Sequence, residues 1–331
     1  MDSIILWTVV FLALSFDFIN GFHDTANAIA TSVSTRALKP RVAILMAAVM
    51  NFLGAILFTG VAKMIGGGVA NPAELSNGVE IVIAALLSAI IWNLVTWWFG
   101  IPSSSSHALI GSLAGAVIAG AGMSAINGTG LLDIAKALFL SPLIAFAAGF
   151  IIMWILKRIF AYRSPHQVNK GFRFAQILTA AFQSFSHGTN DAQKAMGIIT
   201  FALVAAGVQD NMEVPLWVKL SAALAMALGT SIGGYKIIKT MGTKIFKIEP
   251  INGFAADMGS AVVILGATLF HLPVSTTHVI TSSILGVGSA KRFSSVRWNV
   301  AGRIGIAWVI TIPITVVMAA GIFWLIDLFF I

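Results

Sequence analysis

The chain has 331 residues, of which 58% are apolar and 10% are charged, with a formal net charge of +8 and no cysteine. A soluble chain carries roughly 25% charged residues, so this composition excludes an ordinary soluble domain, and the missing cysteines exclude disulfides and thiolate metal sites. Several apolar runs reach the roughly 17–25 residues that cross a bilayer, which predicts an all-α polytopic membrane protein.

Ten apolar segments are predicted in chain order. In the first part of the chain they cover 4–30, 42–62, 79–99, 107–122 and 135–156. In the second part they cover 174–207, 216–235, 253–271, 278–290 and 304–328. The third and fourth segments of each part form a pair whose connector carries hydroxyls and a histidine, as in a broken or re-entrant helix. We therefore expect about 10–12 transmembrane or re-entrant helices.

The positive charges indicate the topology. Sixteen of the twenty Lys and Arg residues lie in four loops, at 36–41, 157–173, 236–247 and 291–303. By the positive-inside rule these loops are cytoplasmic, which accounts for the net charge without nucleic acid as a partner. Seven acids lie in the alternate connections: Asp2, Glu74, Glu80, Asp133, Asp210, Glu213 and Asp327. Both the N-terminus and the C-terminus are therefore predicted outside the cell.

The two parts of the chain repeat one another in opposite orientation. Aligning Pro102 with Pro273 pairs PSSSSH with PVSTTH. Aligning Gly21 with Gly188 pairs GFHDTANA with GTNDAQKA. Inverted repeats are typical of secondary transporters, which bind their substrates near the bilayer midplane at interrupted helices. We therefore predict a first transmembrane repeat (1–156), a basic cytoplasmic linker (157–173) and an inverted second repeat (174–331).

The first pair of motifs places an acid beside a glycine inside an apolar run. Asp24 and Asp191 each cost about 2.5–3.5 kcal/mol to insert at mid-membrane, so a purely incidental occurrence is disfavoured. Carboxylates accompanied by Asn and backbone oxygens suit a hard cation such as sodium. The alternative is structural, with each acid paired to Lys194 or to a neighbouring histidine.

The second pair of motifs has the residue order of a helix start, with Pro followed by Ser or Thr and then an apolar run. The free N–H groups at such a start carry partial positive charge, and together with the hydroxyls they form an anion site. The alternative is that these Ser and Thr side chains bond back to carbonyls of their own helix.

Other buried polar residues each allow two interpretations. Asp17 and Asp257 are either cation ligands or proton carriers, or they hold helices together. Lys194 is either the charge partner of Asp191 or a substrate contact. His107 and His278 either donate to an anion or cap a helix as neutral side chains.

The membrane potential favours coupled transport. Moving a divalent anion into a cell held about 100 mV negative costs about 4.6 kcal/mol, because each charge costs about 2.3 kcal/mol. Co-transported cations would cancel that charge, which predicts a cation–anion symporter. Several alternatives remain. The coupling ion could be the proton, and the anion could be an oxyanion such as sulfate. The protein could also be a channel or facilitator, or an intramembrane hydrolase that uses a serine with His107. The hydrolase gives no reason for a matching copy in the opposite orientation.

At these motifs the sequence resembles the inorganic phosphate transporter (PiT) family of sodium- or proton-coupled phosphate symporters. The resemblance spans essentially the whole chain and rests on GFHDTANA with GTNDAQKA and on PSSSSH with PVSTTH. Two features depart from the family pattern. His23 stands where the first copy usually has Asn, and the large cytoplasmic loop of the animal members is absent.

The resemblance implies a symporter in the plasma membrane, not an enzyme, that moves inorganic phosphate with sodium by alternating access and needs no cofactor beyond its coupling ions. It implies phosphate ligands at Ser104, Ser105, Ser106, Thr276 and Thr277. It implies sodium ligands at Asp24, Asn27, Asn190 and Asp191. Further candidate ligands are His23, Thr25, Lys194, Asp257 and Ser275. The expected partners are phosphate, sodium or protons, and the lipid bilayer, and the sequence leaves a homodimer open.

Overall fold

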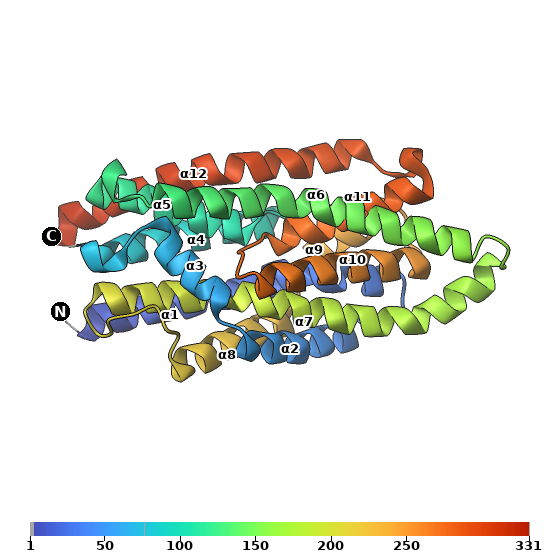
Figure 1. Ribbon diagram of the computed structural model, residues 1–331, viewed down its shortest axis with the longest axis horizontal. Coiled ribbons are helices and arrows are strands. Elements are labelled where there is room, and N and C mark those ends of the chain that lie inside the picture. The colour runs from blue at the N-terminus through green and yellow to red at the C-terminus, as the bar shows by residue number, and fades with distance from the viewer. Residues whose placement is uncertain (1–2, 76, 331) are drawn as a thin grey trace.

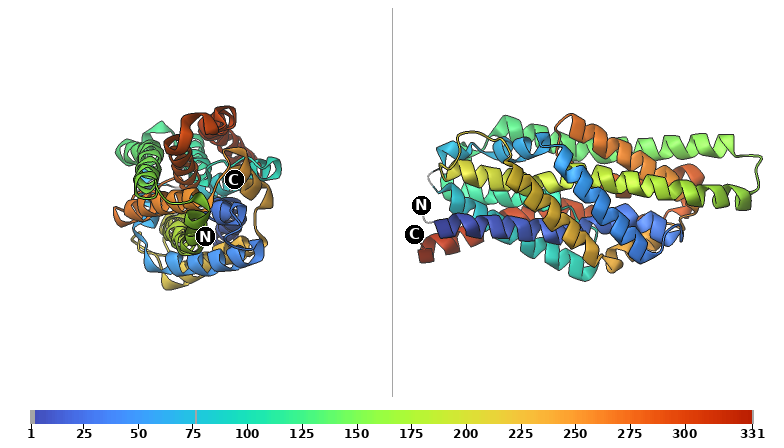
Figure 2. Two further views of the ribbon diagram at one scale, coloured as in Figure 1. Left: turned by 90° about the vertical axis from the view of Figure 1, so that its right-hand side faces the viewer. Right: turned by 90° about the horizontal axis from the view of Figure 1, so that it is seen from below.

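The structure is a computed structural model that describes residues 3–75 and 77–330. Its helices lie along one long axis in an elongated bundle, seen from three directions in Figures 1 and 2. Within the described residues the regular structure is helical, apart from one isolated bridge between Ala70 and Ile126. The all-α prediction is confirmed. Asp2, one of the acids behind the predicted topology, lies outside the described residues.

The helices follow the predicted segments with a few differences. The first part of the chain forms α1 (Ser3–Ser34), α2 (Pro40–Leu57), α3 (Gly60–Val69), η1 (Pro72–Glu74), α4 (Gly78–Phe99), α5 (Ser105–Ala121), η2 (Met123–Ala125) and α6 (Gly128–Ile159). The second part forms α7 (Pro165–Ala205), α8 (Leu216–Ile232), α9 (Tyr235–Lys239), the π-helical turn η3 (Thr240–Lys244), α10 (Pro250–Leu269), α11 (Thr276–Arg292), η4 (Phe293–Ser295) and α12 (Trp298–Phe330).

Several of these helices suit a lipid bilayer. Six of them in the described chain are long and apolar enough to cross a membrane: α1, α2, α4, α6, α10 and α12. The helix α8 and the turn-and-helix unit α9–η3 qualify together as a seventh span, bent by 64°. Large apolar side chains lie on the surface, and Phe11, Phe139 and Val309 are 70%, 72% and 73% exposed. Such a surface is stable against lipid tails rather than water, and the protein is a multi-pass membrane protein.

Two predicted boundaries differ from the structure. The predicted segment 42–62 is broken between α2 and α3, where Phe58 and Thr59 leave helical geometry. Most of the predicted linker 157–173 is helical, and only residues 160–164 separate α6 from α7. Ser164 caps α7 by accepting from the Gln167 N–H, and Pro165 occupies the first turn. A basic loop therefore contains a strong helix start, which charge counting alone does not reveal.

The two parts of the chain run along the bundle in opposite directions. The helix α1 begins and α12 ends at the same end of the bundle, whereas α6 and α7 are joined at the opposite end (Figures 1 and 2). Gly100 and His271, which the alignment of Pro102 with Pro273 pairs, take the same left-handed conformation, with φ of 66° and 60°. These features are those that an inverted repeat requires. The repeat itself and the side of the membrane that each end faces stay predictions.

The motif glycines allow two close helix contacts. A Cβ at Gly21 on α1 would lie 2.8 Å from the Thr230 nitrogen on α8, and a Cβ at Gly188 on α7 would lie 2.6 Å from the Asn51 Cα on α2. Small residues let membrane helices approach this closely. Each glycine thus allows its helix to pack closely against a neighbour, α1 against α8 and α7 against α2. This packing places polar side chains of α1 and α7 in the protein centre.

Apolar clusters flank this polar centre. One contains Val9 and Phe16 of α1, and the other contains Ala26 and Ile29 of the same helix. The polar residues between them face the middle of the bundle, where lipid and bulk water do not reach. An interrupted helix is tolerated at that depth because protein surrounds it.

Candidate functional site

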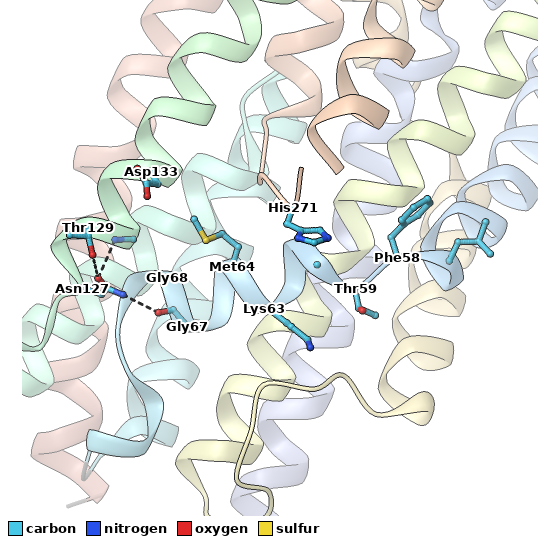
Figure 3. Close-up of a pocket in the computed structure, with 13 residues that line it drawn as sticks. Phe58, Thr59, Lys63, Met64, Gly67, Gly68, Asn127, Thr129, Asp133 and His271 are labelled. Carbon is cyan, nitrogen blue, oxygen red and sulfur yellow. Dashed lines mark hydrogen bonds between the residues drawn. The ribbon is translucent and has the colours of Figure 1, made fainter. Parts of the chain in front are cut away.

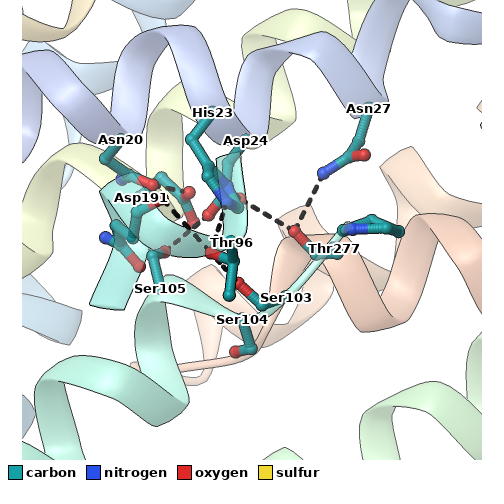
Figure 4. Close-up of polar contacts among 12 residues, drawn as sticks. Asn20, His23, Asp24, Asn27, Thr96, Ser103, Ser104, Ser105, Asp191 and Thr277 are labelled. Carbon is teal, nitrogen blue, oxygen red and sulfur yellow. Dashed lines mark hydrogen bonds and ion pairs between the residues drawn. The ribbon is translucent and has the colours of Figure 1, made fainter. Parts of the chain in front are cut away.

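The two acidic motifs meet at the centre of the bundle through one serine (Figure 4). Asp24 on α1 and Asp191 on α7 are 1% and 0% exposed. Ser105, at the start of α5, donates to Asp24 Oδ2 at 2.5 Å. The same hydroxyl accepts from Lys194 Nζ at 2.8 Å. Lys194 Nζ also lies 2.8 Å from Asp191 Oδ1. The chain of contacts therefore runs from one acid to the other by way of a hydroxyl and an ammonium group.

Asp24 has two further side-chain partners besides Ser105. Thr277 Oγ1 donates to Asp24 Oδ1 at 2.9 Å, and His23 Nδ1 lies 2.7 Å from the same oxygen. Because a carboxylate only accepts, the histidine donates through Nδ1. Asn27 Nδ2 donates to Thr277 Oγ1 at 2.9 Å, and the buried Asn27 Oδ1 has no partner among the described residues. The carboxylate of Asp24, the Thr277 hydroxyl and the Asn27 amide are in consecutive contact, and they are the kinds of group that bind a hard cation.

Asp191 lies in a different electrostatic setting. Besides the ammonium group of Lys194, it contacts His187 Nε2 at 3.2 Å and accepts from Asn20 Nδ2 at 3.3 Å. All of these side chains are completely buried. The expected pairing of Asp191 with Lys194 is therefore present, and Lys194 also reaches Ser105.

The starts of α5 and α11 are built alike. Ser104 accepts from the His107 N–H at 3.1 Å, and Ser275 accepts from the His278 N–H at 3.3 Å. The two serines are therefore helix caps, in agreement with the predicted helix starts. Each start also leaves its first N–H groups without partners inside the helix, which favours an anion.

The two helix starts face one another. The rings of His107 and His278 stack with their centroids 4.5 Å apart, and His278 also stacks on Trp308 at 3.8 Å. Ser106 donates to the Val274 carbonyl at 2.9 Å, which ties the start of α5 to the connector before α11. The arrangement brings two positive helix ends to one place, as an oxyanion site requires.

Most of the hydroxyls expected to bind phosphate have other acceptors in this structure. Ser105 and Thr277 both donate to Asp24, and Ser106 donates to a backbone carbonyl. A hydroxyl has a single proton, so these three cannot donate elsewhere without changing partner. Thr276 Oγ1 is buried and has no partner among the described residues.

His23 and Asn190 occupy equivalent positions when Gly21 is aligned with Gly188. Both side chains hydrogen-bond to groups that hold a connector in place. His23 Nε2 lies 3.1 Å from Thr96 Oγ1, which accepts from Ser103 at 2.8 Å. Asn190 Nδ2 donates to Thr268 Oγ1 at 3.0 Å. Asn190 Oδ1 accepts from the Val274 N–H at 3.3 Å. Each motif thus holds the connector of the neighbouring broken helix, and both polar atoms of Asn190 are engaged there rather than at Asp191.

Thr25 lies toward α2 and α8 rather than toward the helix starts. Its hydroxyl is 3.0 Å from Thr230 Oγ1 and accepts from Asn51 Nδ2 at 2.9 Å. Asn51 Oδ1 is in turn 3.0 Å from His187 Nδ1. Thr25 therefore connects to Asp191 through this network and does not contact Asp24.

Asp257 forms a second, separate polar cluster. Thr31 Oγ1 donates to Asp257 Oδ1 at 2.6 Å, and Thr179 Oγ1 lies 3.5 Å from Oδ2. Nearby, Thr35 donates to Gln176 Oε1 at 2.6 Å. This cluster joins α1, α7 and α10 one to two turns beyond Asn27, and it does not include the helix starts.

Three residues of the centre have contacts that the motif analysis did not select: Asn20, Thr96 and His187. The repeat could have pointed to two of them. The alignment that sets Asp24 on Asp191 also sets Asn20 on His187, and both of these side chains contact Asp191 Oδ2. Asp17 is completely buried, and neither of its carboxylate oxygens has a hydrogen-bond partner among the described residues.

A cavity of about 720 Å³ opens at the break between α2 and α3 (Figure 3). Thr59 and Lys63 line it from α3 and its cap, Asn127 and Asp133 from the start of α6, and His271 from the α10–α11 connector. The cavity therefore runs from exposed loop residues to the connector that holds the second helix start.

Comparisons with known proteins show which family the chain is similar to. The sequence profile of the phosphate transporter family matches residues 20–319. A probable low-affinity inorganic phosphate transporter of Bacillus subtilis (strain 168) is 58% identical and covers 100% of both chains. A protein of the same description from Rhizobium meliloti (strain 1021) is 47% identical over 97% of this chain and 96% of its own. A solved structure described as "The sodium-dependent phosphate transporter" superposes with a TM-score of 0.87 at 26% identity, over 98% of this chain and 99% of the other.

Proposed function

The chain belongs to the phosphate transporter family, and from that premise we propose that it is a sodium-coupled symporter that binds phosphate between the starts of α5 and α11. It is a transporter of the plasma membrane rather than an enzyme. The related solved structure, which is described as sodium-dependent, supports sodium as the coupling ion.

One observation carries the coupling proposal. The carboxylate of Asp24 accepts one hydrogen bond from each helix start, from Ser105 of α5 and from Thr277 of α11. The same two hydroxyls are predicted phosphate ligands. The candidate cation ligand and the candidate anion ligands are therefore in direct contact.

This contact suggests how sodium and phosphate help one another to bind. A sodium ion beside Asp24 would be held by the carboxylate, by the free Asn27 Oδ1 and by the oxygen of Thr277. Sodium would then replace the hydroxyl protons as the carboxylate's partners. The protons of Ser105 and Thr277 would become available to phosphate oxygens. Each ligand would raise the affinity for the other, which is the reciprocal coupling that symport needs.

Electrostatics favour the same order of events. A phosphate dianion next to an unscreened Asp24 is repelled strongly in a site from which water is excluded. A sodium ion between them converts this repulsion into attraction on both sides. We therefore propose that sodium binds before phosphate from the outside.

Alternating access is the expected transport cycle. The cavity at the α2–α3 break reaches the α10–α11 connector from the side of the α5–α6 loop, which is predicted to be extracellular. Rocking of one repeat against the other would close this path and open one on the opposite face. We propose that the structure stands nearer to the outward-facing end of this cycle.

The test is uptake of labelled phosphate into liposomes that contain the purified protein. We expect accumulation with an inward sodium gradient, little without it, and no inhibition by excess sulfate. Asp24→Asn should abolish sodium-dependent uptake, whereas Asp210→Asn, in an exposed loop, is the matched control and should not. Accumulation driven only by a proton gradient would replace sodium by protons. Inhibition by sulfate would broaden the substrate class, and full uptake by Asp24→Asn would contradict the coupling site.

A further inference from the structure

The two acidic motifs are equivalent in position but not in charge. The alignment that sets Asp24 on Asp191 also sets Asn27 on Lys194. Asn27 follows Asp24 by three positions, as Lys194 follows Asp191, so each of them lies on the same helix face as its acid, one turn later. One motif therefore pairs its acid with an amide, and the other pairs its acid with an ammonium group.

The ammonium group of Lys194 lies deep in the site. The side chain is completely buried, and Nζ is 2.8 Å from both Asp191 Oδ1 and Ser105 Oγ. A buried charge of this kind is stable only when it is paired and hydrogen-bonded, and Lys194 has both kinds of partner. It thus bridges one acid and the hydroxyl that donates to the other acid.

A histidine contacts the acid in both motifs, His23 at Asp24 and His187 at Asp191, but within the described residues no lysine or arginine contacts Asp24. Its partners are the side chains of His23, Ser105 and Thr277, and the side chain at the position of Lys194 is the amide of Asn27. The free Asn27 Oδ1 offers a lone pair to a cation, where Lys194 offers a positive charge. The first motif therefore lacks a lysine beside its acid, and the second motif has one.

We propose that the Lys194 ammonium group is a tethered substitute for one coupling ion, so that Asp24 alone recruits sodium from solution. The inference rests on the proposed function, because it concerns the number of ions in the same site. It changes the role of Asp191, which becomes the permanent partner of Lys194 rather than a sodium ligand. Lys194 thereby sets how many sodium ions move with each phosphate.

Lys194→Asn tests this directly, because it gives the second motif the residue of the first. The variant leaves Asp191 without its cation and adds an amide oxygen beside it. We expect one more sodium ion per phosphate, measured as the ratio of labelled sodium to labelled phosphate uptake in proteoliposomes. The dependence of uptake on sodium concentration should become steeper by the same step.

Two further variants control for charge. Lys194→Arg keeps a tethered cation and should keep the wild-type ratio even where the rate falls. The double variant Asp191→Asn with Lys194→Asn removes the acid as well, so the additional sodium ion should be lost again. A ratio that stays high in the double variant would contradict a site at Asp191.

A second measurement covers variants that bind without transporting. A ligand that binds only the folded protein raises its Tm as the ligand concentration rises. The Tm of Lys194→Asn in detergent should therefore respond more steeply to sodium than that of the wild type, at constant ionic strength set with a large organic cation.

The results separate this inference from the proposed function. An unchanged sodium-to-phosphate ratio together with an unchanged sodium response of Tm in Lys194→Asn would overturn the inference. A raised KM for phosphate with the wild-type ratio would instead make Lys194 a phosphate contact, which also overturns it. A wild-type protein whose phosphate uptake ignores sodium would overturn the proposed function itself.

Discussion

The connectors 100–104 and 271–275 share their backbone but differ in their surroundings. Each begins with a residue in the left-handed conformation and ends with a serine that caps a helix. Around the first connector, Thr240 donates to the Gly100 carbonyl at 3.2 Å and Lys236 donates to the Trp98 carbonyl at 2.9 Å. Around the second, His271 packs against Gly60 and lines the open cavity.

The local sequence therefore determines the backbone conformation of each connector, and the neighbouring short helix determines whether that connector is covered or open. The unit α9–η3 covers the first connector, whereas α3 leaves the second one open on one side. Alternating access between the two predicted repeats requires an asymmetry of this kind. The hydroxyls differ in the same way, since Thr277 donates to Asp24 and its equivalent Ser106 donates to a backbone carbonyl.

Cysteine labelling gives the largest expected difference between the connectors. The chain has no cysteine, so single substitutions can be labelled without a background. We expect Thr59→Cys, in the cavity, to react with a membrane-impermeant thiol reagent added outside, and Thr240→Cys, which is 6% exposed, to resist the reagent from either side. Reaction of Thr240→Cys from the cytoplasmic side, with Thr59→Cys protected, would reverse the assignment of the open face.

The helix-start hydroxyls give the next largest effect. Ser105→Ala removes the link between Asp24 and Lys194, and hydrogen bonds to charged groups contribute about 1.5–3 kcal/mol, or roughly a 10- to 150-fold change in an equilibrium constant. We expect weaker binding of both sodium and phosphate, measured as the two half-saturating concentrations for uptake. Thr276→Val should raise only the KM for phosphate, because this hydroxyl does not contact Asp24. Equal effects of both variants on sodium would contradict the assigned contacts.

Gly100→Ala gives a smaller effect, on stability. An alanine at φ 66° is strained, and its Cβ would lie 3.1 Å from the Lys236 Cβ. We expect a loss of about 1–2 kcal/mol in the free energy of unfolding, seen as a lower Tm in detergent. Gly266→Ala is the matched control, because this helical glycine has open space around it and should gain about 0.5–1 kcal/mol. An unchanged Tm for Gly100→Ala would show that the first connector is not held tightly by α9–η3.

The two caps should differ least of all. Ser104→Ala and Ser275→Ala each remove one N-cap bond, which contributes about 0.5–2 kcal/mol, whereas replacement by glycine costs only a few tenths. We expect equal losses in Tm for the two alanine variants and smaller losses for the two glycine variants, measured without phosphate. A clear difference between Ser104→Ala and Ser275→Ala would show that the caps of the two repeats are not equivalent.

The sequence by itself determined the membrane class, most helix positions and several of the central residues, among them Asp24, Asp191 and Lys194. Apolar runs of bilayer length and the duplicated motifs carried this information, because insertion costs and cap preferences are local properties. It placed Ser104 and Ser275 at helix starts, and both proved to be caps. It also left open whether Lys194 pairs with Asp191, and the structure contains that pair.

Only the tertiary structure decided which side chains meet. Ser105 and Asp24 are 81 residues apart in the sequence, and Thr277 and Asp24 are 253 residues apart. No local sequence pattern predicts a contact between residues so far apart in the chain. The break between α2 and α3 lies in an uninterrupted apolar run, where Gly60 makes room for the His271 ring. Tertiary packing likewise places the Asn190 side chain against Thr268 and the Val274 N–H rather than against Asp191. Packing between distant helices determines the partner of a buried polar group, because most such groups in a dry interior are hydrogen-bonded.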